Sequence, residues 1–311
     1  MTKVSAQNSG PKNMVRLYED NDFFNLSGHG TDESYSAGTR VDWFYNRKSR
    51  HGIDRLMPQL KNSNNTYSWG IAQLIYTPTD LRKTDYQTKD YMYSGALYLN
   101  HALYSYNPKK RNGLKTEYII GVRGPKSYAR ETQTAVHHEI NDVIPQGWNN
   151  QLQGQLLINV NMTYEQQLWS VSDFLEVNAG AQVKAGSLTD AITVYPMIRA
   201  GKMSKYFNGY LNQFTSFLKG NKRVRHQYYV FFRPAASVVM YNAMVEGHTM
   251  AGNKIVQWHP TNMEHRVLDF TFGGVVVLNR FSISYTQTTT QSFIHGARTH
   301  VIGNISLAYS W

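Results

Sequence analysis

Apolar and polar residues alternate with a period of two along most of the chain, which predicts strands with two chemically different faces. The segment 34–45 is representative. One face would carry the larger and more apolar side chains, Tyr35, Ala37, Thr39, Val41, Trp43 and Tyr45. The other face would carry Ser36, Gly38, Arg40 and Asp42. This alternation is typical of a barrel strand that separates lipid from a polar lumen.

We expect a strand wherever this pattern extends over enough residues to cross a membrane. The segments are 14–24, 34–45, 67–76, 91–106, 115–123, 148–164, 173–184, 189–200, 227–245, 264–278, 281–293 and 299–311. Pro196 interrupts one of them and predicts a bulge or bend there. Residues 1–13 have the composition of a polar tail, and residues 202–225 show no clear pattern.

The predicted fold is all-β, because these twelve segments form an even number, as a closed antiparallel barrel with both termini on one side requires. We therefore predict a 12-stranded transmembrane β-barrel that occupies residues 14–311 as a single domain. Closure removes unpaired strand edges, so many exposed apolar positions are tolerated without aggregation. A soluble all-β protein is the alternative.

One stretch, about 124–148, departs from the strand pattern. Residues 128–140 contain no Gly or Pro, so we predict a short helix in a loop, with Ser127 as its N-cap. One helical face would carry polar side chains with a spacing of three or four residues: Arg130, Gln133, Thr134 and His137. We expect this helix to cap the barrel and His137 to be its working residue.

Composition supports the barrel and excludes other classes. The 311 residues include 22 Tyr and no Cys, and only 17% are charged, which suits a barrel with lipid outside and water inside. The net charge of +11 suits an anionic lipid partner, and no nucleic-acid-binding motif accompanies it. No apolar run reaches the roughly 18 residues of a transmembrane helix. Residues 1–8 lack the apolar part of a signal peptide, so we expect a mature chain with an added initiator Met.

Strand counting places several polar groups together. If both termini are periplasmic, the connections after the first, third and fifth strands lie on the extracellular rim. Those connections carry the segment 20–22, the pair Arg82 and Lys83, and His137. Ser36 lies near the start of the second strand at the same rim.

A histidine beside hydroxyl and carboxylate groups is suited to acyl transfer, and two routes are open. In one, Ser36 is the nucleophile and His137 its base. In the other, His137 deprotonates water, and a cation held by Asp22 stabilises the oxyanion. The segment 20–33 is rich in oxygen ligands, which suits calcium, although it is not an EF-hand loop. The chain also lacks the Gly-x-Ser-x-Gly and His-Glu-x-x-His motifs.

Four groups of residues resemble the outer-membrane lipid A 3′-O-deacylase family in order and spacing. They are Leu17-Tyr-Glu-Asp-Asn-Asp-Phe-Phe24, Tyr35-Ser-Ala-Gly38, Gln73-Leu-Ile-Tyr-Thr-Pro78, and Gly124-Pro125 followed by His137 and Trp148. The resemblance covers the first half of the chain by motif and the second half by strand number and length. It implies a calcium-dependent esterase that removes the acyloxyacyl group from the 3′ position of lipid A, at a site between the barrel wall and an outer-loop helix.

The resemblance also implies roles for individual residues. His137 would be the general base toward water, and Asn21 and Asp22 match the family's Asn-Asp pair beside calcium. Ser36 matches its hydroxyl position and Gln133 its helical Gln. Lys83 and Arg82 would contact anionic sugar or phosphate. The family's Glu after the His matches either Glu139 or Asp142, and its counterpart here stays open.

Lipid A or whole lipopolysaccharide in the outer leaflet is thus the expected partner, with the protein embedded in a bacterial outer membrane as a monomer. An outer-membrane phospholipase is the alternative enzyme. A porin or adhesin barrel without catalysis is the alternative of another class.

Overall fold

The computed structural model describes residues 11–26, 34–85, 90–215, 217–219, 222–224, 226–251, 254–258, 263–294 and 299–311. Most of the predicted tail, residues 1–10, lies outside the described residues. No helix in the described part of the chain is long and apolar enough to cross a membrane.

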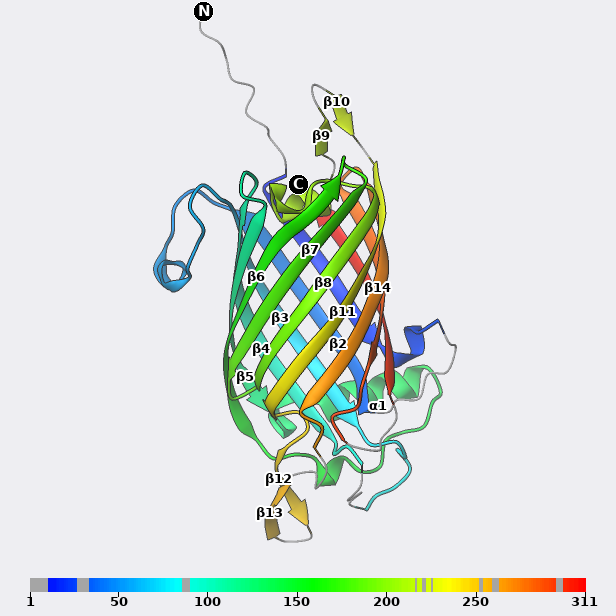
Figure 1. Cartoon of the computed structure of the whole chain (residues 1–311). Coiled ribbons are helices and arrows are strands. Elements are labelled where there is room, and N and C mark those ends of the chain that lie inside the picture. Colours follow the sequence, from blue (N-terminus) through cyan, green and yellow to red (C-terminus); the bar gives the residue numbers. More distant parts are fainter. Residues whose placement is uncertain are drawn as a thin grey trace, which may run out of the picture.

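Within the described ranges, twelve antiparallel strands close into one barrel, as the sequence predicts (Figure 1). They are β1 (Asn13–Asn21), β2 (Ser34–Asn46), β3 (Asn64–Thr77), β4 (Ser94–Asn107), β5 (Asn112–Arg123), β6 (Gln155–Val171), β7 (Leu175–Gly186), β8 (Thr189–Lys202), β11 (His226–Asn242), β14 (Arg266–Leu278), β15 (Phe281–Thr290) and β16 (His300–Ser310). The barrel closes where β1 pairs with β16, in a continuous register from Met14↔Ser310 to Asn21↔Gly303.

Apart from one helix, the sequence pattern did not predict the elements outside this wall. Short hairpins form from β9 (Phe217–Lys219) with β10 (Lys222–Val224) and from β12 (Gly247–Ala251) with β13 (Lys254–Trp258). The 3₁₀ turns η1 (Asp22–Phe24) and η4 (Trp148–Asn150) replace the predicted strand ends at residues 22–24 and 148–150. In both places a polar loop begins while the apolar alternation still continues in the sequence.

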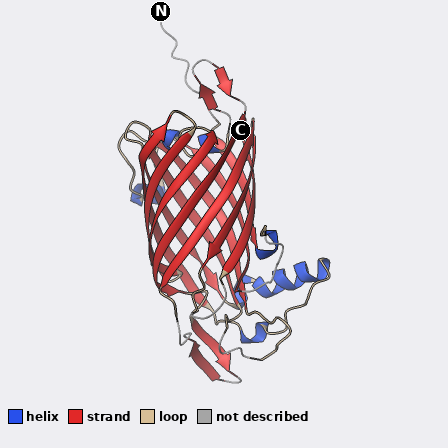
Figure 2. Ribbon diagram, turned by 45° about the vertical axis from the view of Figure 1, so that its right-hand side comes forward, coloured by secondary structure: helices blue, strands red, loops and turns tan. Residues whose placement is uncertain are grey.

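The predicted helix is confirmed as α1 (Ala129–Glu139), which lies beside the barrel at the end opposite the termini (Figures 1 and 2). Its start differs from the prediction. The N-cap is Tyr128, in the left-handed region with φ of 57°, and its side chain makes no capping bond. Ser127 still contributes, because its Oγ accepts a long hydrogen bond from the Ala129 N–H at 3.4 Å.

Both chain ends meet at the other end of the barrel, where the Lys12 N–H donates to the Trp311 carbonyl at 3.0 Å. We call this the termini end and the opposite one the helix end. The connections after β1, β3 and β5 all lie at the helix end (Figure 1). The predicted convergence of the segment 20–22, Arg82, Lys83, His137 and Ser36 at one rim is therefore confirmed.

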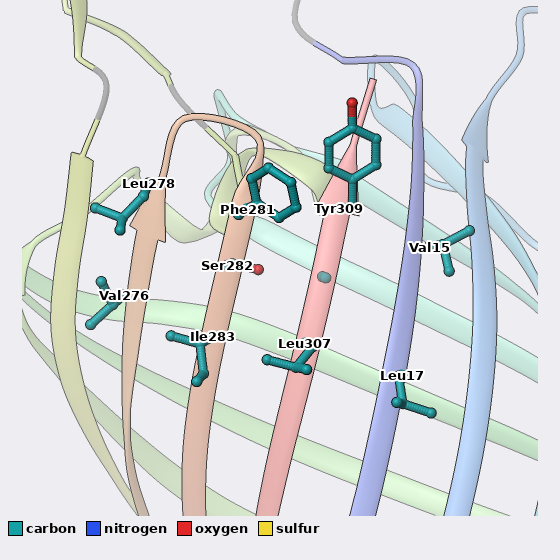
Figure 3. A pocket seen from close by; sticks show the side chains of 10 residues that line it. Val15, Leu17, Val276, Leu278, Phe281, Ser282, Ile283, Leu307 and Tyr309 are labelled. Carbon is teal, nitrogen blue, oxygen red and sulfur yellow. The ribbon is translucent and has the colours of Figure 1, made fainter.

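The outer wall carries the apolar set of each strand. On β14 the exposed side chains are Leu268, Phe270, Phe272, Val276 and Leu278, as the alternation predicts. Figure 3 shows a shallow hollow of this wall across β14, β15, β16 and β1, near the turn Asn279–Arg280. Its lining is almost wholly aliphatic and aromatic and it lies at the termini end, so it belongs to the lipid-facing band and not to the polar rim.

Of the bulge or bend predicted at Pro196, the strand register excludes the bulge. The register between β8 and β11 is the same on both sides of it, from Ile198↔Phe232 to Val194↔Ala236, which places Pro196 opposite Pro234. Neither proline has an N–H to donate, so this stretch of the ladder is interrupted without a shift. The register shifts farther along, between Val239 and Tyr241.

Side chains and loops fill the lumen. An ionic chain crosses its middle, in which Arg16 and Arg40 bond the Asp42 carboxylate at 2.9 and 2.8 Å and Arg40 also reaches Glu117 at 3.2 Å. At the termini end, residues 203–215 fold into the mouth, and the Tyr210 ring stacks on Tyr104 at 3.9 Å between centroids.

Loop residues also close the helix end of the lumen. Ala243 and Met244 are buried against Tyr98 and neighbouring wall residues. Arg123, which is 2% exposed, donates to the carbonyls of Ala243 and Glu246 and so fixes this loop across the mouth. Residues 203–215, part of the segment 202–225 that the sequence left unassigned, thus contribute one of two closures of the barrel.

We expect the intact barrel to conduct no steady ion current in planar lipid bilayers, because packed side chains occupy both mouths. The double substitution Phe207→Ala and Tyr210→Ala removes two buried rings from the termini-end closure and should produce measurable current. Tyr228→Ala and Phe281→Ala, which remove exposed rings from the outer wall, are the control. Steady current through the unaltered protein would contradict a filled lumen.

Candidate active site

A β-bulge turns Ser36 to the outer side of the barrel wall. The β2–β3 register shifts between Tyr35↔Tyr76 and Ala37↔Ile75, so Ser36 is an extra residue in β2. Tyr35 instead points into the lumen, where its hydroxyl donates to Asp20 Oδ2 at 2.8 Å. The predicted faces of these two residues are therefore wrong, because a bulge shifts the period of two by one position.

Ser36 is nevertheless buried, at 1% exposure, because loops cover the outer wall at the helix end. Its Oγ shares a hydrogen bond with the Thr77 hydroxyl, on the outward face of β3. Ala37, next to Ser36, packs against an apolar cluster of Ile75, Leu81, Tyr93, Ala129 and Trp148. This outer-wall cluster joins residues from the wall, the helix and two loops.

Gly95 allows α1 to lie directly on the wall. A Cβ at this position would overlap the Ala129 methyl and the Ser127 hydroxyl, so a side chain larger than hydrogen pushes the helix away. Gln73, on the neighbouring strand, donates from Nε2 to the Ser127 carbonyl at 2.7 Å. The start of the helix is thus fixed by one close approach and one hydrogen bond.

His137 lies on the buried side of α1, together with Ala129 and Gln133. Its Nδ1 is 2.6 Å from the Val143 carbonyl oxygen. A carbonyl only accepts hydrogen bonds, so Nδ1 carries the proton and Nε2 holds the lone pair in the neutral ring. Val143 in turn packs on the outer-wall cluster, so the ring orientation is tied to the wall.

Gln133 is held one helical turn before His137. Its Oε1 accepts from the Trp148 indole N–H at 2.9 Å. Its Nε2 is buried and has no hydrogen-bond partner within the described residues. A buried amide N–H without a partner is costly, and such groups are common where a ligand supplies the missing acceptor.

The two candidate carboxylates after His137 differ in their contacts. Asp142 Oδ1 accepts from the Val143 N–H at 2.6 Å, and the Asp142 N–H donates to the His137 carbonyl at 2.9 Å. Glu139 is exposed on the other side of the helix. Asp142 therefore supports Val143, whose carbonyl bonds His137 Nδ1. Neither Asp142 nor Glu139 takes the place of that carbonyl at Nδ1.

Asn21 and Asp22 lie on the other flank of Ser36. Asn21 pairs with Ala37 across the wall, and its Oδ1 accepts from the Phe23 N–H at 2.8 Å. Asp22 is 5% exposed, and its carbonyl accepts from Asn25 Nδ2 at 2.5 Å. The site residues Asn21, Ser36, Gln133 and His137 thus all lie around the same patch of outer wall.

Residues far along the chain hold η1, and no sequence pattern predicted this contact. The Tyr285 hydroxyl donates to the Phe24 carbonyl at 2.9 Å, and Gln287 Oε1 accepts from the Leu26 N–H at 2.8 Å. Gly303 on β16 lies so close to the Phe24 carbonyl that a Cβ would collide with it. One sequence feature could have identified these residues. β15 carries polar side chains at outward positions, where lipid-facing side chains are expected.

The groups near Asp22 that could bind a metal ion all do so through oxygen. One carboxylate, the Asn21 and Asn25 amides, backbone carbonyls and the Ser36 hydroxyl offer oxygen atoms, which suit a hard cation such as calcium. Asn21 Oδ1 keeps a second lone pair after accepting from Phe23. No group of three or more His, Asp or Glu suited to a metal occurs in the described part of the chain. A cation here would therefore rely on neutral oxygens as well as on Asp22.

Arg82 and Lys83 lie on a neighbouring loop and are exposed. The loop is tied to the segment after α1, where the Gln146 N–H donates to the Leu81 carbonyl at 2.9 Å and Asn150 Nδ2 to the Thr84 carbonyl at 2.6 Å. Lys83 approaches Asp80 at 3.6 Å with both groups in solvent, so this ion pair is weak. Both cations remain available at the edge of the site.

The fold and site define an outer-membrane-type β-barrel with a covered polar site outside its wall. A family model described as outer membrane protein LpxR matches residues 1–311, the whole chain. The chain belongs to the LpxR family of outer membrane proteins.

One solved structure supports the fold, and two others resemble the chain less closely. LpxR from Salmonella typhimurium is similar over 96% of this chain and 100% of its own, with 16% sequence identity and a TM-score of 0.77. An outer membrane channel from Pseudomonas putida F1 aligns over 100% of both chains, with 8% identity and a TM-score of 0.49. The β domain of the Bordetella autotransporter BrkA aligns over 96% and 98%, with 8% identity and a TM-score of 0.46. No curated protein matches the sequence.

We expect Gly95→Val to detach the start of α1 from the wall and leave the barrel closed. Hydrogen exchange of residues 124–140 should become faster, while the heat-sensitive gel mobility of the folded barrel stays the same. Ala236→Val is the control, since it enlarges an exposed position of β11 far from the helix. Unchanged exchange in Gly95→Val would show that the helix is not seated against this glycine.

Proposed function

We propose that this protein is a calcium-dependent esterase that hydrolyses the 3′-linked acyloxyacyl group of lipid A, with the site at the extracellular rim. Membership of the LpxR family supports the lipid A substrate class. Both termini lie at the end opposite α1, so periplasmic termini would place α1 and the site toward the outer leaflet, where lipopolysaccharide resides.

The observation that carries the proposal is the position of His137. Its ring is buried at 3% exposure between α1 and the wall, and its Nδ1–H is committed to the Val143 carbonyl. This leaves Nε2 as the basic atom, which is the arrangement a general base requires. A position on the outer wall lets a lipid enter sideways from the membrane without passing through the filled lumen.

The reaction is an acyl transfer to water. His137 Nε2 takes a proton as water attacks the ester carbonyl carbon, and a tetrahedral intermediate forms. The Gln133 Nε2–H group, which has no partner in the described structure, would donate to a substrate oxygen. Collapse of the intermediate breaks the bond to the sugar oxygen, which takes the proton back from His137. The products are a free acyloxyacyl acid and a 3′-hydroxyl.

Asp22, with Asn21 and neighbouring neutral oxygens, would hold the calcium ion. When bound, calcium supplies positive charge that stabilises the oxyanion. Lys83 and Arg82 would contact the phosphate or acidic sugar groups of the substrate, since both side chains are exposed on the loop tied to α1. Asp142 would be the positioning carboxylate, through the Val143 peptide.

A phospholipase with Ser36 as nucleophile is the second candidate, because Ser36 is buried on the same wall. The two candidates differ in what Ser36 does. As a nucleophile its oxygen would form an acyl ester, whereas in the water route it only helps to form the site. A porin is disfavoured by the closures at both mouths of the lumen.

We expect His137→Ala to lower the rate of lipid A deacylation by about a hundredfold to ten-thousandfold, the range of a lost general base. His138→Ala is the matched control, because its side chain is exposed on the same helix. Ser36→Ala should retain part of the activity, because water and not Ser36 attacks the ester, and the unaltered protein should show no acyl-enzyme by mass spectrometry. Acylated Ser36 in the unaltered protein, or cleavage of phospholipid but not lipid A, would favour the phospholipase.

Removal of calcium with a chelator should stop hydrolysis, and added calcium should restore it. Asp22→Asn lowers the charge of the donor set, so the calcium concentration for half-maximal rate should rise by about tenfold or more. Asp173→Asn, an exposed carboxylate at the termini end, should leave that concentration unchanged. Full activity after chelation would remove calcium from the mechanism.

A further inference from the structure

The connection 46–63 forms a second built surface, on the outside of the barrel at the termini end. In Figure 1 it is the blue loop that stands beside the wall, and it contains the 3₁₀ turn η2 (Gly52–Leu56). It covers outward positions of β3, β4 and β5, where lipid would otherwise lie. Met57, Tyr67 and Leu103 are all at or below 1% exposure in the interface.

A buried ionic cluster holds this loop to the wall. Asp54 is 1% exposed and its Oδ1 is 2.8 Å from Nε2 of His101, an outward residue of β4. Arg47 pairs with the other oxygen of Asp54. The His101 Nδ1 is 2.9 Å from the Ser68 carbonyl, and the Tyr118 hydroxyl donates to the Leu56 carbonyl at 3.0 Å.

The outer side of the loop combines apolar and cationic groups. Leu56 is 73% and Ile53 43% exposed. The loop has five cationic residues and a single carboxylate, Asp54, which the buried cluster uses. Three of the cations are exposed and make no side-chain bond in the described structure: Lys48, Arg55 and Lys61.

The loop lies at the level of a belt of aromatic residues. Trp43 pairs with Trp69 and Trp69 with His101 in the register of the wall, and both indoles are about half exposed. Exposed Trp residues on a barrel surface lie at the boundary between hydrocarbon and headgroups. Apolar side chains beside cations at this depth fit a phospholipid, with acyl chain against Leu56 and phosphate against the cations.

We propose that residues 46–63 bind an anionic glycerophospholipid of the membrane leaflet at the termini end. The cations would contact its headgroup, and Ile53 and Leu56 would enter the boundary of the acyl region. The assignment of that leaflet as periplasmic rests on the orientation in the proposed function, but lipid binding itself does not. The bound lipid would fix the depth of the barrel on the side opposite lipopolysaccharide.

The test is native mass spectrometry of the full chain in detergent, with dioleoyl phosphatidylglycerol or dioleoyl phosphatidylcholine added. We expect retention of phosphatidylglycerol over phosphatidylcholine, which has the same acyl chains and no net charge. Lys48→Gln, Arg55→Gln and Lys61→Gln together should weaken it about a hundredfold, at roughly fivefold for each charge lost. The triple variant Lys109→Gln, Lys110→Gln and Arg111→Gln has the same net charge at another turn and should bind normally.

Equal retention of the two lipids, or equal loss in the two triple variants, would overturn the proposal. Neither readout involves hydrolysis, so failure here is distinct from failure of the esterase assignment.

A second measurement uses the absence of Cys from the chain, because a single introduced Cys is then the only site that a thiol-reactive fluorophore labels. A fluorophore on Leu56→Cys should be quenched by brominated phosphatidylglycerol in bilayers, and one on Lys109→Cys by aqueous iodide. Iodide quenching of the Leu56 label to the same degree would place the loop in water and reject the inference.

Discussion

Closure of the hydrogen-bonded wall is the constraint on which the rest of this structure depends. The strand ladder runs without an open edge from β1 round to β16, so the wall can stand in lipid with no unpaired edge. In a barrel of this size side chains can fill the interior, and here ionic groups, tyrosines and two loop closures do so. A substrate of the proposed reaction therefore has no route through the lumen, which is why we assign the proposed chemistry to the outside of the wall.

The outside of the wall is made into a site by small departures from regular strands. A bulge brings Ser36 outward, and a glycine at position 95 lets Ala129 and the start of α1 lie against the sheet. His137 and Gln133 then point from the helix toward the wall, where His137 Nδ1 bonds the Val143 carbonyl and Gln133 Oε1 accepts from the Trp148 indole. This geometry fits the proposed route, in which a lipid reaches His137 without leaving the membrane plane.

The sequence predicted the features of the fold that depend on the two-residue alternation and on the even number of strands. Alternation located every barrel strand, and an even count placed both termini at one end and the polar loops at the other. The site was predictable only in part. The outward position of Ser36 depends on one extra residue in β2, and a pattern of period two does not show which residue is extra. The support of η1 by Tyr285 and Gln287 depends on contacts between residues about 260 positions apart, which local patterns do not encode.

The prediction of the helix was limited in a similar way. Spacing identified α1 and placed Gln133 and His137 on a common side, but it also grouped Arg130 with them, and that side chain is exposed and bonds Asn149. A helical repeat gives relative directions, and only packing against the wall decides which direction is buried. The backbone carbonyl of Val143, which accepts from Nδ1 of His137, is a contact that the sequence pattern did not predict.

The most direct test of the central claim is the mass spectrum of lipid A from cells that express this chain, beside cells that express His137→Ala at equal level. The account predicts loss of one acyloxyacyl mass with the unaltered protein and intact lipid A with the variant. Intact lipid A in both, with a folded protein in the outer membrane, would contradict it.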